Sequence, residues 1–468
     1  MDVTSTLKAT DGFFSSSQRT PHKVAIRCGD RSVSYSELVT KVRRIQHYCI
    51  YNLNLKVGDR VSLLGDNSIE YLEMLIALID IGVGVVTINP KSSPEEVEQV
   101  TKDLVTSVNF KFKNNFQVCF TEAASFGDPI DMDLSEELFT GNVLFNWSTP
   151  ATIIFSSGTT GKSKPIFVTH KARVMTSLSM PLSWGWSMDD VYLSLPSLST
   201  GGGSACALAA LYIGAEVVIA EQHTSEYLVN LINTRKITAL LTVPAITHSL
   251  VNKIYEHKVR SIVSSTDVFS YDLKVKANAL WSDALYDTYA TTEHGPISLL
   301  TPKDFCSKPK SVGRACIGSK IKIIDDQGNE VSNGTPGNIV ATTLTQVGEG
   351  WIRTNDIGYL DEDNFLFILG RANDLIVTRG YNIHPQEIED VINKYPGVVE
   401  SCVVGLPDKR WGEIPVAFIV GSVESSELIS YLRNKISRYK VPRKFIQIDS
   451  IPKNILGKVE RKKLRELL

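Results

Sequence analysis

The chain has 468 residues, more than one ordinary hydrophobic core can hold, so we expect at least two domains. Its hydrophobic fraction of 43% and charged fraction of 21% are typical of a globular protein, and the formal charge of -2 gives no reason to expect a nucleic acid or an anionic membrane surface as a partner. The seven cysteines are scattered without a CxxC pair, which argues against a disulfide framework or a structural zinc site and predicts a reducing, cytoplasmic location.

The amino-terminal residues lack the basic and apolar regions of a signal peptide. Two apolar stretches, 71–86 and 203–220, are short and interrupted by charged residues. We therefore expect buried helices and strands there and no membrane span.

Strand-like and helix-like segments alternate over the first 300 residues. This βαβ rhythm predicts largely parallel sheets flanked by helices, which is an α/β fold. Helical spacing is seen at residues 70–80 and 93–102. Short apolar strands are predicted at residues 61–64, 83–88, 191–195, 216–219 and 239–242.

After residue 310 the pattern changes to alternating strands separated by turns, which predicts an antiparallel or barrel-like subdomain. A compact α+β unit follows from Asp374, with predicted helices at 385–394 and 426–437. We predict an N-terminal domain of residues 1–371, containing the parallel-type sheets and the barrel-like subdomain, and a small C-terminal domain of residues 372–468.

A loop rich in hydroxyl groups and glycine, residues 156–165, follows a strand-like segment. Small residues let backbone N–H groups approach an anion, and Ser, Thr and Lys add donors, so the loop is a candidate phosphate site. A plain polar turn is one alternative. A Walker A loop is another, but its first glycine would fall on Ser156.

This loop resembles the phosphate loop of the adenylate-forming superfamily, which includes acyl- and aryl-CoA synthetases, adenylation domains of peptide synthetases, and luciferases. The family pattern is approximately [ST]-S-G-T-T-G-x-P-K-G; Ser163 and Pro165 depart from it. The resemblance implies an ATP-binding role for Ser156, Ser157, Gly158, Thr159, Thr160, Gly161 and Lys164.

Further segments resemble the family in order and spacing over nearly the whole chain. Residues 289–293 resemble Y-G-x-T-E, which implies that Tyr289 contacts the nucleotide, Thr292 contacts phosphate, and Glu293 binds Mg²⁺ and shares in catalysis with Thr292. Residues 351–356 resemble W-x-x-T-G-D, whose aspartate, here Asp356, binds the ribose hydroxyls. Arg371 lies in a G-R-x-[DK]-D-like segment and is implied to reach the ribose or phosphate.

The C-terminal residues complete the resemblance. Asn373 holds the family's hinge position, and residues 379–389 resemble R-G-x-x-I-x-P-x-E-I-E. Lys458 lies where P-x-x-x-x-G-K-x-x-R places the catalytic lysine, carried on a mobile lid. A lysine bridging the carboxylate and the α-phosphate would stabilise the adenylation transition state. Taken alone, the basic tail could equally be a solvated helix face.

Several positions depart from the family pattern. Ala290 and Asn355 replace glycines, and Asn338 replaces a glutamate. Ser264, Ser265 and Thr266 replace the Gly-Gly-Ala stretch that packs on adenine, and the histidine of P-x-x-H is missing after Pro196. The run of small residues 199–204 predicts either a flexible loop or room for an extended acyl group.

The resemblance implies an ATP-dependent acid–thiol ligase, an acyl-CoA synthetase that uses ATP, Mg²⁺ and CoA, with fatty acid metabolism as the expected setting. Its partners would be a small carboxylic acid and CoA. Two alternatives stay open: an adenylation enzyme that loads a separate acyl carrier protein in trans, and a catalytically reduced homologue that binds acyl groups or nucleotide.

Overall fold

The structure is a computed structural model that describes residues 7–111, 118–119, 129–130, 134–156, 164–251, 253, 259–265, 269, 271–281, 283–378, 381–408, 411–453 and 459–468. The chain forms two compact units. The first comprises Met1–Pro309, Ala315–Lys320 and Thr342–Gly350; the second comprises Lys310–Arg314, Ile321–Ala341 and Trp351–Leu468. The second unit includes residues before 371, so the predicted boundary between residues 371 and 372 stays a prediction.

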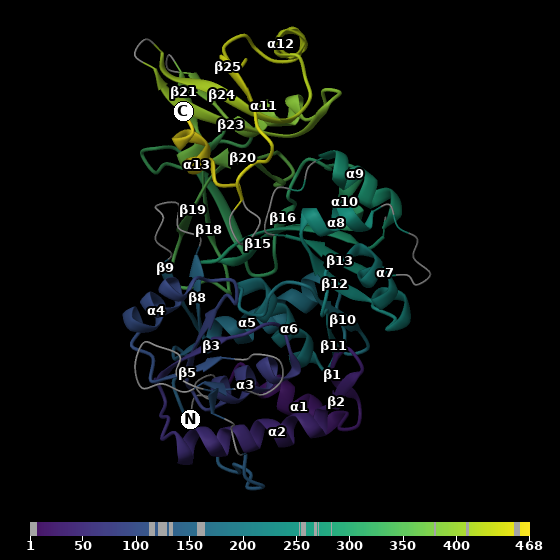
Figure 1. The fold of residues 1–468 in the computed structure, drawn as a ribbon, viewed down its shortest axis with the longest axis vertical. Coiled ribbons are helices and arrows are strands. Elements are labelled where there is room, and N and C mark those ends of the chain that lie inside the picture. Colours follow the sequence, from purple (N-terminus) through teal and green to yellow (C-terminus); the bar gives the residue numbers. More distant parts are fainter. Residues whose placement is uncertain are drawn as a thin grey trace. The chain divides into compact units, whose positions relative to one another are not determined.

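The first unit contains two mostly parallel sheets (Figure 1). One sheet has the strand order β2 (Arg31–Ser34), β1 (Val24–Cys28), β11 (Glu216–Ile219), β10 (Val191–Ser194), β12 (Ala239–Thr242), β13 (Ser261–Ser264), β14 (Leu285–Thr291), β15 (Gly295–Leu300) and β16 (Arg314–Ala315). The other has the order β5 (Val108–Lys111), β3 (Arg60–Leu64), β4 (Gly84–Ile88), β8 (Pro150–Ser156) and β9 (Lys164–Thr169). The predicted α/β class and the strands of this region are confirmed.

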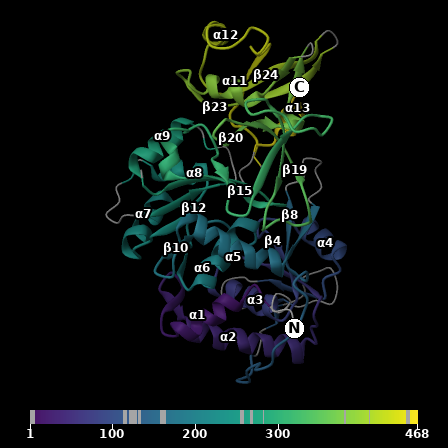
Figure 2. The ribbon, with the colours of Figure 1, turned by 180° about the vertical axis from the view of Figure 1, so that it is seen from behind.

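Three helices lie between these two sheets: α3 (Ile69–Asp80), α5 (His170–Trp184) and α6 (Gly201–Ile213). Helix α5 contacts β8 and β9 of one sheet and β15 of the other, and it runs beside α6 (Figures 1 and 2). Every residue of α3 is buried, including Glu73, whose pKa is raised to about 7 by burial. Such an all-round buried helix explains the near-continuous apolar stretch that the sequence shows there.

The remaining helices of the first unit pack around these layers. Several begin at a side-chain cap: Ser93 accepts the backbone N–H of Glu96 before α4, and Pro94 occupies the first helical position, where its missing N–H costs nothing. Their bounds are α1 Asp11–Arg19, α2 Tyr35–His47, α4 Pro94–Asp103, α7 Ser225–Thr234, α8 Pro244–Leu250, α9 Tyr271–Leu280 and α10 Pro302–Phe305.

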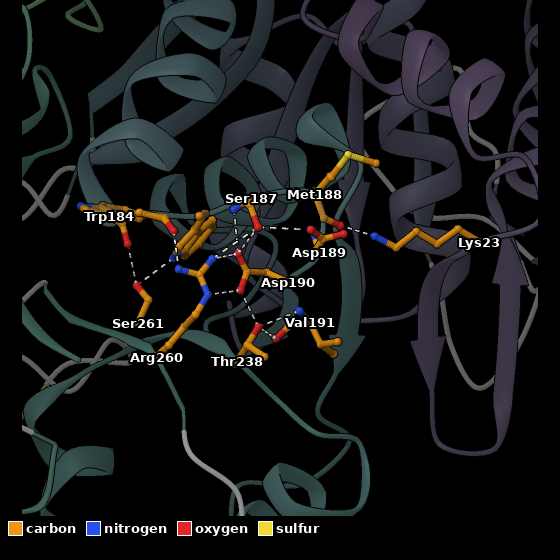
Figure 3. Close-up of polar contacts among 12 residues, drawn as sticks. Lys23, Trp184, Ser187, Met188, Asp189, Asp190, Val191, Thr238, Arg260 and Ser261 are labelled. Carbon is orange, nitrogen blue, oxygen red and sulfur yellow. Dashed lines mark hydrogen bonds and ion pairs between the residues drawn. The ribbon is translucent and has the colours of Figure 1, made fainter. Parts of the chain in front are cut away.

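A polar network fixes the amino ends of strands β10, β12 and β13 (Figure 3). The guanidinium of Arg260 pairs with the buried carboxylate of Asp190, which also accepts a hydrogen bond from Thr238 Oγ1 at 2.7 Å. Trp186 Nε1 donates to Ser261 Oγ at 2.9 Å. Ligands of open α/β sheets generally bind at the opposite edge, where the parallel strands end.

The second unit contains two further sheets. The first has the order β17 (Lys320–Ile324), β18 (Gly337–Thr342), β19 (Ile352–Leu360) and β20 (Leu366–Arg371), with antiparallel pairing from β18 to β20. The other contains β22 (Tyr381–Ile383), β21 (Ile376–Thr378), β24 (Gly412–Gly421), β23 (Val398–Asp408) and β25 (Lys444–Gln447). In the first unit, the two-residue strands β6 (Val118–Cys119) and β7 (Pro129–Ile130) pair with each other.

The long hairpin β23–β24 divides the second unit's core into two layers because successive side chains point to opposite faces. Val403 and Ala417 pack with α11 (Pro385–Ile392) and α12 (Ser425–Arg433). Val404 and Phe418 pack with Leu464 of α13 (Arg461–Glu466). The predicted α+β character is confirmed. In the described part of the chain, no helix has the length and apolarity needed to cross a bilayer.

Candidate functional site

The predicted phosphate loop connects two antiparallel strands. Ser156 at the end of β8 pairs with Lys164 at the start of β9, and Lys164 is exposed. The next helix begins only at His170. A Walker A loop leads from a strand directly into a helix, so this arrangement rules out that alternative. The other predicted loop residues, Ser157, Gly158, Thr159, Thr160 and Gly161, lie outside the described residues.

A tightly bonded turn between β14 and β15 carries the predicted Thr292 and Glu293. The carbonyl of the buried His294 accepts hydrogen bonds from Thr343 Oγ1 and Thr345 Oγ1, each at 2.6 Å. Thr291 Oγ1 is 2.7 Å from His294 Nδ1. These contacts fix the backbone on both sides of Glu293 and present its side chain, half-buried, at the end of the sheet. Tyr289 lies on β14 opposite Ser298.

One short segment joins this turn to the phosphate hairpin. The backbone N–H of Val347 donates to the carbonyl of Glu293 at 2.8 Å. The side chain of Val347 packs on the apolar cluster of Ile154, Ile166 and Val168, which belongs to β8 and β9. The structure therefore brings Glu293 close to the strands that flank the predicted phosphate loop. The sequence contained no motif for this link.

The departures at the strand ends place small, buried polar residues there. Ser264 ends β13, and its buried hydroxyl has no hydrogen-bond partner among the described residues. The backbone of Ser265 donates to Thr242 at the end of β12, at 3.1 Å. Thr266 lies outside the described residues.

The segment that lacks the family histidine is held by Asn67, a residue that sequence analysis missed. Asn67 Nδ2 donates to the carbonyl of Pro196 at 3.0 Å, and its Oδ1 accepts the N–H of Leu198 at 2.7 Å. Thr87 Oγ1 donates to the carbonyl of Ser199 at 2.8 Å. An isolated asparagine after a strand carries no signal that would have identified this clamp.

The flexible-loop alternative for residues 199–204 is wrong for residues 201–204, because these form the first turn of α6. Thr200 caps this helix by accepting the N–H of Gly203 at 3.1 Å. A β-carbon on Gly203 would lie 2.1 Å from the carbonyl oxygen of Ser197, so only glycine fits there. The cap and this close approach outweigh the low helix propensity of glycine.

In the second unit, Asp356 of β19 pairs with Arg371 of β20. The two residues are register partners, and Arg371 Nε lies 4.0 Å from Asp356 Oδ1. Arg371 is the more exposed, with 46% of its side chain accessible against 16% for Asp356. The two residues implied in ribose binding therefore lie side by side.

Asn355, which replaces a family glycine, has a φ of 65°. Asparagine tolerates this left-handed conformation, whereas other residues with a β-carbon are strained by about 1–2 kcal/mol. The side chain is exposed, so its removal should cost little by itself.

We expect Asn355→Ala to lower the free energy of unfolding by about 1 kcal/mol, and Asn355→Gly to change it by less than about 0.5 kcal/mol. Urea denaturation of both variants measures the difference. Equal destabilisation by alanine and glycine would contradict a backbone role for this position.

Glu293 is the predicted ligand of Mg²⁺. Among the described residues, no three His, Cys, Asp or Glu side chains gather closely enough to hold an ion. A single carboxylate on a fixed turn fits an ion that arrives with ATP, because Mg²⁺ is commonly bound by one or two carboxylates together with substrate phosphates. The Glu293 carboxylate therefore fits Mg²⁺ that is bound together with a nucleotide.

Lys458 and the residues Arg379 and Gly380 of the predicted lid loop lie outside the described residues. The residues that flank Lys458 are anchored: Val459 forms a bridge with Lys453, and the side chain of Arg461 binds Glu389 through two nitrogen atoms. Arg461 is the last residue of the predicted lysine motif, and the motif alone did not predict its contact with Glu389.

Two protein-family models match this chain. A model described as AMP-binding enzyme matches residues 13–350, and one described as AMP-binding enzyme C-terminal domain matches residues 387–458. The resemblance predicted from sequence is confirmed.

Individual relatives cover nearly the full chain. A 2-succinylbenzoate–CoA ligase from Bacillus cereus (strain ATCC 10987) is 28% identical over 475 residues, covering 96% of each protein. One from Bacillus mycoides (strain KBAB4) has the same identity and coverage. The structure of o-succinylbenzoate coenzyme A synthetase (MenE) from Bacillus subtilis, in complex with ATP and magnesium, is similar with a TM-score of 0.88 at 26% identity, over 97% of this chain and 99% of that one. ATP-bound MatB from Rhodopseudomonas palustris shares the fold, with a TM-score of 0.87 at 24% identity over 98% and 99% of the two chains.

Proposed function

The chain belongs to the family of AMP-binding enzymes, and we propose on this basis that it is an ATP-dependent ligase that joins a carboxylic acid to coenzyme A. The observation that carries this proposal is the match of both family models, in order, along a chain whose relatives are named as CoA ligases over 96% of its length. The proposed reaction uses ATP and CoA as co-substrates and Mg²⁺ as its ion.

The reaction has two steps. A carboxylate oxygen attacks the α-phosphorus of ATP, which forms an acyl-adenylate and releases pyrophosphate. A thiolate then attacks the acyl carbon, which forms the thioester and releases AMP. Both steps develop charge on oxygen atoms, and positioned donors and cations stabilise such charge.

The residues of this chain divide between these tasks. Ser156, Lys164 and the loop between them would hold the phosphates, with Thr292 beside them. Glu293 would bind Mg²⁺, which neutralises phosphate charge when ATP is bound. Asp356 and Arg371 would hold the ribose, and Lys458 would contact the reacting carboxylate.

A carboxylate panel tests the proposal. Protein, ATP and Mg²⁺ are mixed with each acid, and pyrophosphate release is followed; 2-succinylbenzoate, named in the relatives, is the first acid to include. If no acid of a broad panel gives pyrophosphate release, the ligase proposal is overturned and the binding homologue is favoured. Titration calorimetry would then detect ATP binding without turnover. The relatives' names give no support to the earlier expectation of fatty acid metabolism.

The acceptor is tested separately. CoA and purified acyl carrier proteins are offered to the adenylated enzyme in equal amounts, and thioester formation is measured on each. The proposal expects CoA to be the preferred acceptor. Preferential loading of a carrier protein would establish the alternative in which the partner acts in trans.

We expect Asp356→Asn to raise the KM for ATP at least about tenfold, because the amide loses a charged acceptor for the ribose hydroxyls. Initial rates of pyrophosphate release at varied ATP measure this. Asp363→Asn, an exposed carboxylate in the turn before β20, is the matched control. An unchanged KM for ATP in Asp356→Asn would contradict the ribose role.

A further inference from the structure

The backbone carbonyl of His294, the residue directly after Glu293, accepts two threonine hydroxyls. Thr343 Oγ1 and Thr345 Oγ1 each donate to it at 2.6 Å. His294 is fully buried and the two threonines are 8% and 7% exposed, so water has little access to these bonds. A carbonyl oxygen has two lone pairs, and the two hydroxyls fill its accepting capacity.

The same short segment also holds the peptide of Glu293 itself. The backbone N–H of Val347 donates to the carbonyl of Glu293 at 2.8 Å. We call residues 343–347 the brace. All three of these bonds end on backbone carbonyls, so none of them occupies the carboxylate of Glu293. The brace therefore fixes the main chain of the turn and leaves the carboxylate to an ion.

The brace is itself held in a defined shape. Gln346 Oε1 accepts the N–H of Thr343 at 2.8 Å, and Gln346 Nε2 donates to the carbonyl of Gly350 at 2.9 Å. A β-carbon on Gly295 would lie 2.6 Å from Thr345 Oγ1, so the hydroxyl of Thr345 lies directly against the turn. Gly295 has a φ of 69°, which glycine adopts without strain. The turn and the brace fit each other closely.

The other end of the brace lies on the phosphate hairpin. The side chain of Val347 packs on the apolar cluster of β8 and β9. Strand β8 ends at Ser156 and β9 begins at Lys164, so these strands carry both ends of the predicted phosphate loop. One segment thus contacts the turn of Glu293 and the base of that loop. An Mg²⁺ ion shared by a carboxylate and phosphates needs its oxygen ligands at about 2.0–2.1 Å, and such a site must be held to within about 0.5 Å.

We propose that the brace sets the separation between the Glu293 carboxylate and the phosphates of bound ATP, and that Thr343 and Thr345 are positioning residues for Mg²⁺. This inference rests on the proposed function, in which Glu293 binds the ion. The threonines touch neither the ion nor a substrate, and they act through the main chain of the turn. Outer hydrogen bonds that orient a metal ligand typically contribute about 10- to 100-fold to metal affinity or activity.

The first test removes both hydroxyls while keeping the shape of the side chains. In the double variant Thr343→Val, Thr345→Val, the Mg²⁺ concentration for half-maximal pyrophosphate release should rise about tenfold, with the KM for the acid unchanged. Thr343→Ser, Thr345→Ser keeps both hydroxyls and should stay within about threefold of wild type. An unchanged Mg²⁺ dependence in the valine variant, or an equal loss in the serine variant, would overturn the positioning role.

A binding measurement separates the brace from the ligase function. Mn²⁺ also prefers oxygen ligands, and its binding to the complex of protein and α,β-methylene-ATP is followed by electron paramagnetic resonance, without any acid. The Kd for Mn²⁺ should be about tenfold higher in the valine double variant than in wild type. Such a difference supports the brace even where no acid is turned over, in which case only the ligase proposal fails. Equal binding by both proteins, or no binding by either, overturns the brace.

Thr101→Val is the matched control. Thr101 of α4 is likewise buried, and its Oγ1 donates to the carbonyl of Val97 at 3.1 Å. This variant should lower the Tm, because it loses a buried hydrogen bond, and should leave the Kd for Mn²⁺ unchanged.

If the valine double variant does not fold, Thr343→Val alone decides. It leaves one hydroxyl on the carbonyl of His294 and should raise the Kd for Mn²⁺ about three- to fivefold. A Kd equal to that of wild type, or an equal rise in Thr101→Val, would contradict the proposal.

Discussion

Replacing Lys458 with alanine is expected to lower the rate of pyrophosphate release on the order of 100- to 1,000-fold. The reacting carboxylate and the α-phosphate are both anionic, so a positioned cation between them removes repulsion that water would otherwise screen poorly in a closed site. Thioester formation from a supplied acyl-adenylate should stay within about threefold of wild type, because the family resemblance predicts that Lys458 lies on a mobile lid and would leave the site before the second step. The two half-reactions are measured separately.

Lys462→Ala is the matched control, because this lysine lies in the same basic tail with 73% of its side chain exposed. It should leave both half-reactions unchanged. Equal loss of both half-reactions in Lys458→Ala would contradict the alternation between steps. If Lys458→Ala and Lys462→Ala had equal effects, Lys458 would act only as a general surface charge.

The strands and helices were predictable because their signals are local. The predicted strands 216–219 and 239–242 coincide with β11 and β12, since short β-branched and apolar runs that are buried on both faces leave few alternatives. The predicted helix 426–437 instead ends at Arg433. Helix ends depend on capping and on tertiary contacts, and periodicity does not specify these.

The candidate site was predictable only where a motif holds consecutive residues. Such motifs predict the roles of Glu293, Asp356 and Arg371, and these roles stay predictions. Asn67 had no such motif, because it acts through contacts with Pro196 and Leu198, which are distant in sequence.

Arg461 and Glu389 form a buried ion pair within the second unit. Arg461 Nη1 and Nη2 donate to Glu389 Oε1 and Oε2 at 2.6 and 3.1 Å, and Nη1 also donates to the carbonyl of Val403 at 2.9 Å. Only 6% of the Glu389 side chain and 18% of the Arg461 side chain are exposed. Arg461 Nε is also 3.4 Å from Asp374, beside the predicted hinge residue Asn373.

We expect Arg461→Met to lower the free energy of unfolding of the second unit by about 3 kcal/mol, because it leaves the buried carboxylate of Glu389 without its partner. Urea unfolding followed by circular dichroism measures this. Arg465→Met is the control, since Arg465 is more exposed and lies 3.6 Å from Asp374 in a solvent-screened pair that should contribute at most about 1 kcal/mol.

The double variant Arg461→Met, Glu389→Met separates an unpaired charge from a lost packing contact. Replacing both partners removes the buried charge, so part of the lost stability should return.

Because Arg461 follows Lys458 by three residues and also pairs beside the hinge position, Arg461→Met should slow pyrophosphate release as well, even under conditions where the chain stays folded. Two results would show that this ion pair does not anchor the C-terminal tail. One is an unchanged free energy of unfolding in Arg461→Met. The other is a loss of unfolding free energy in the double variant that exceeds the summed losses of the two single variants.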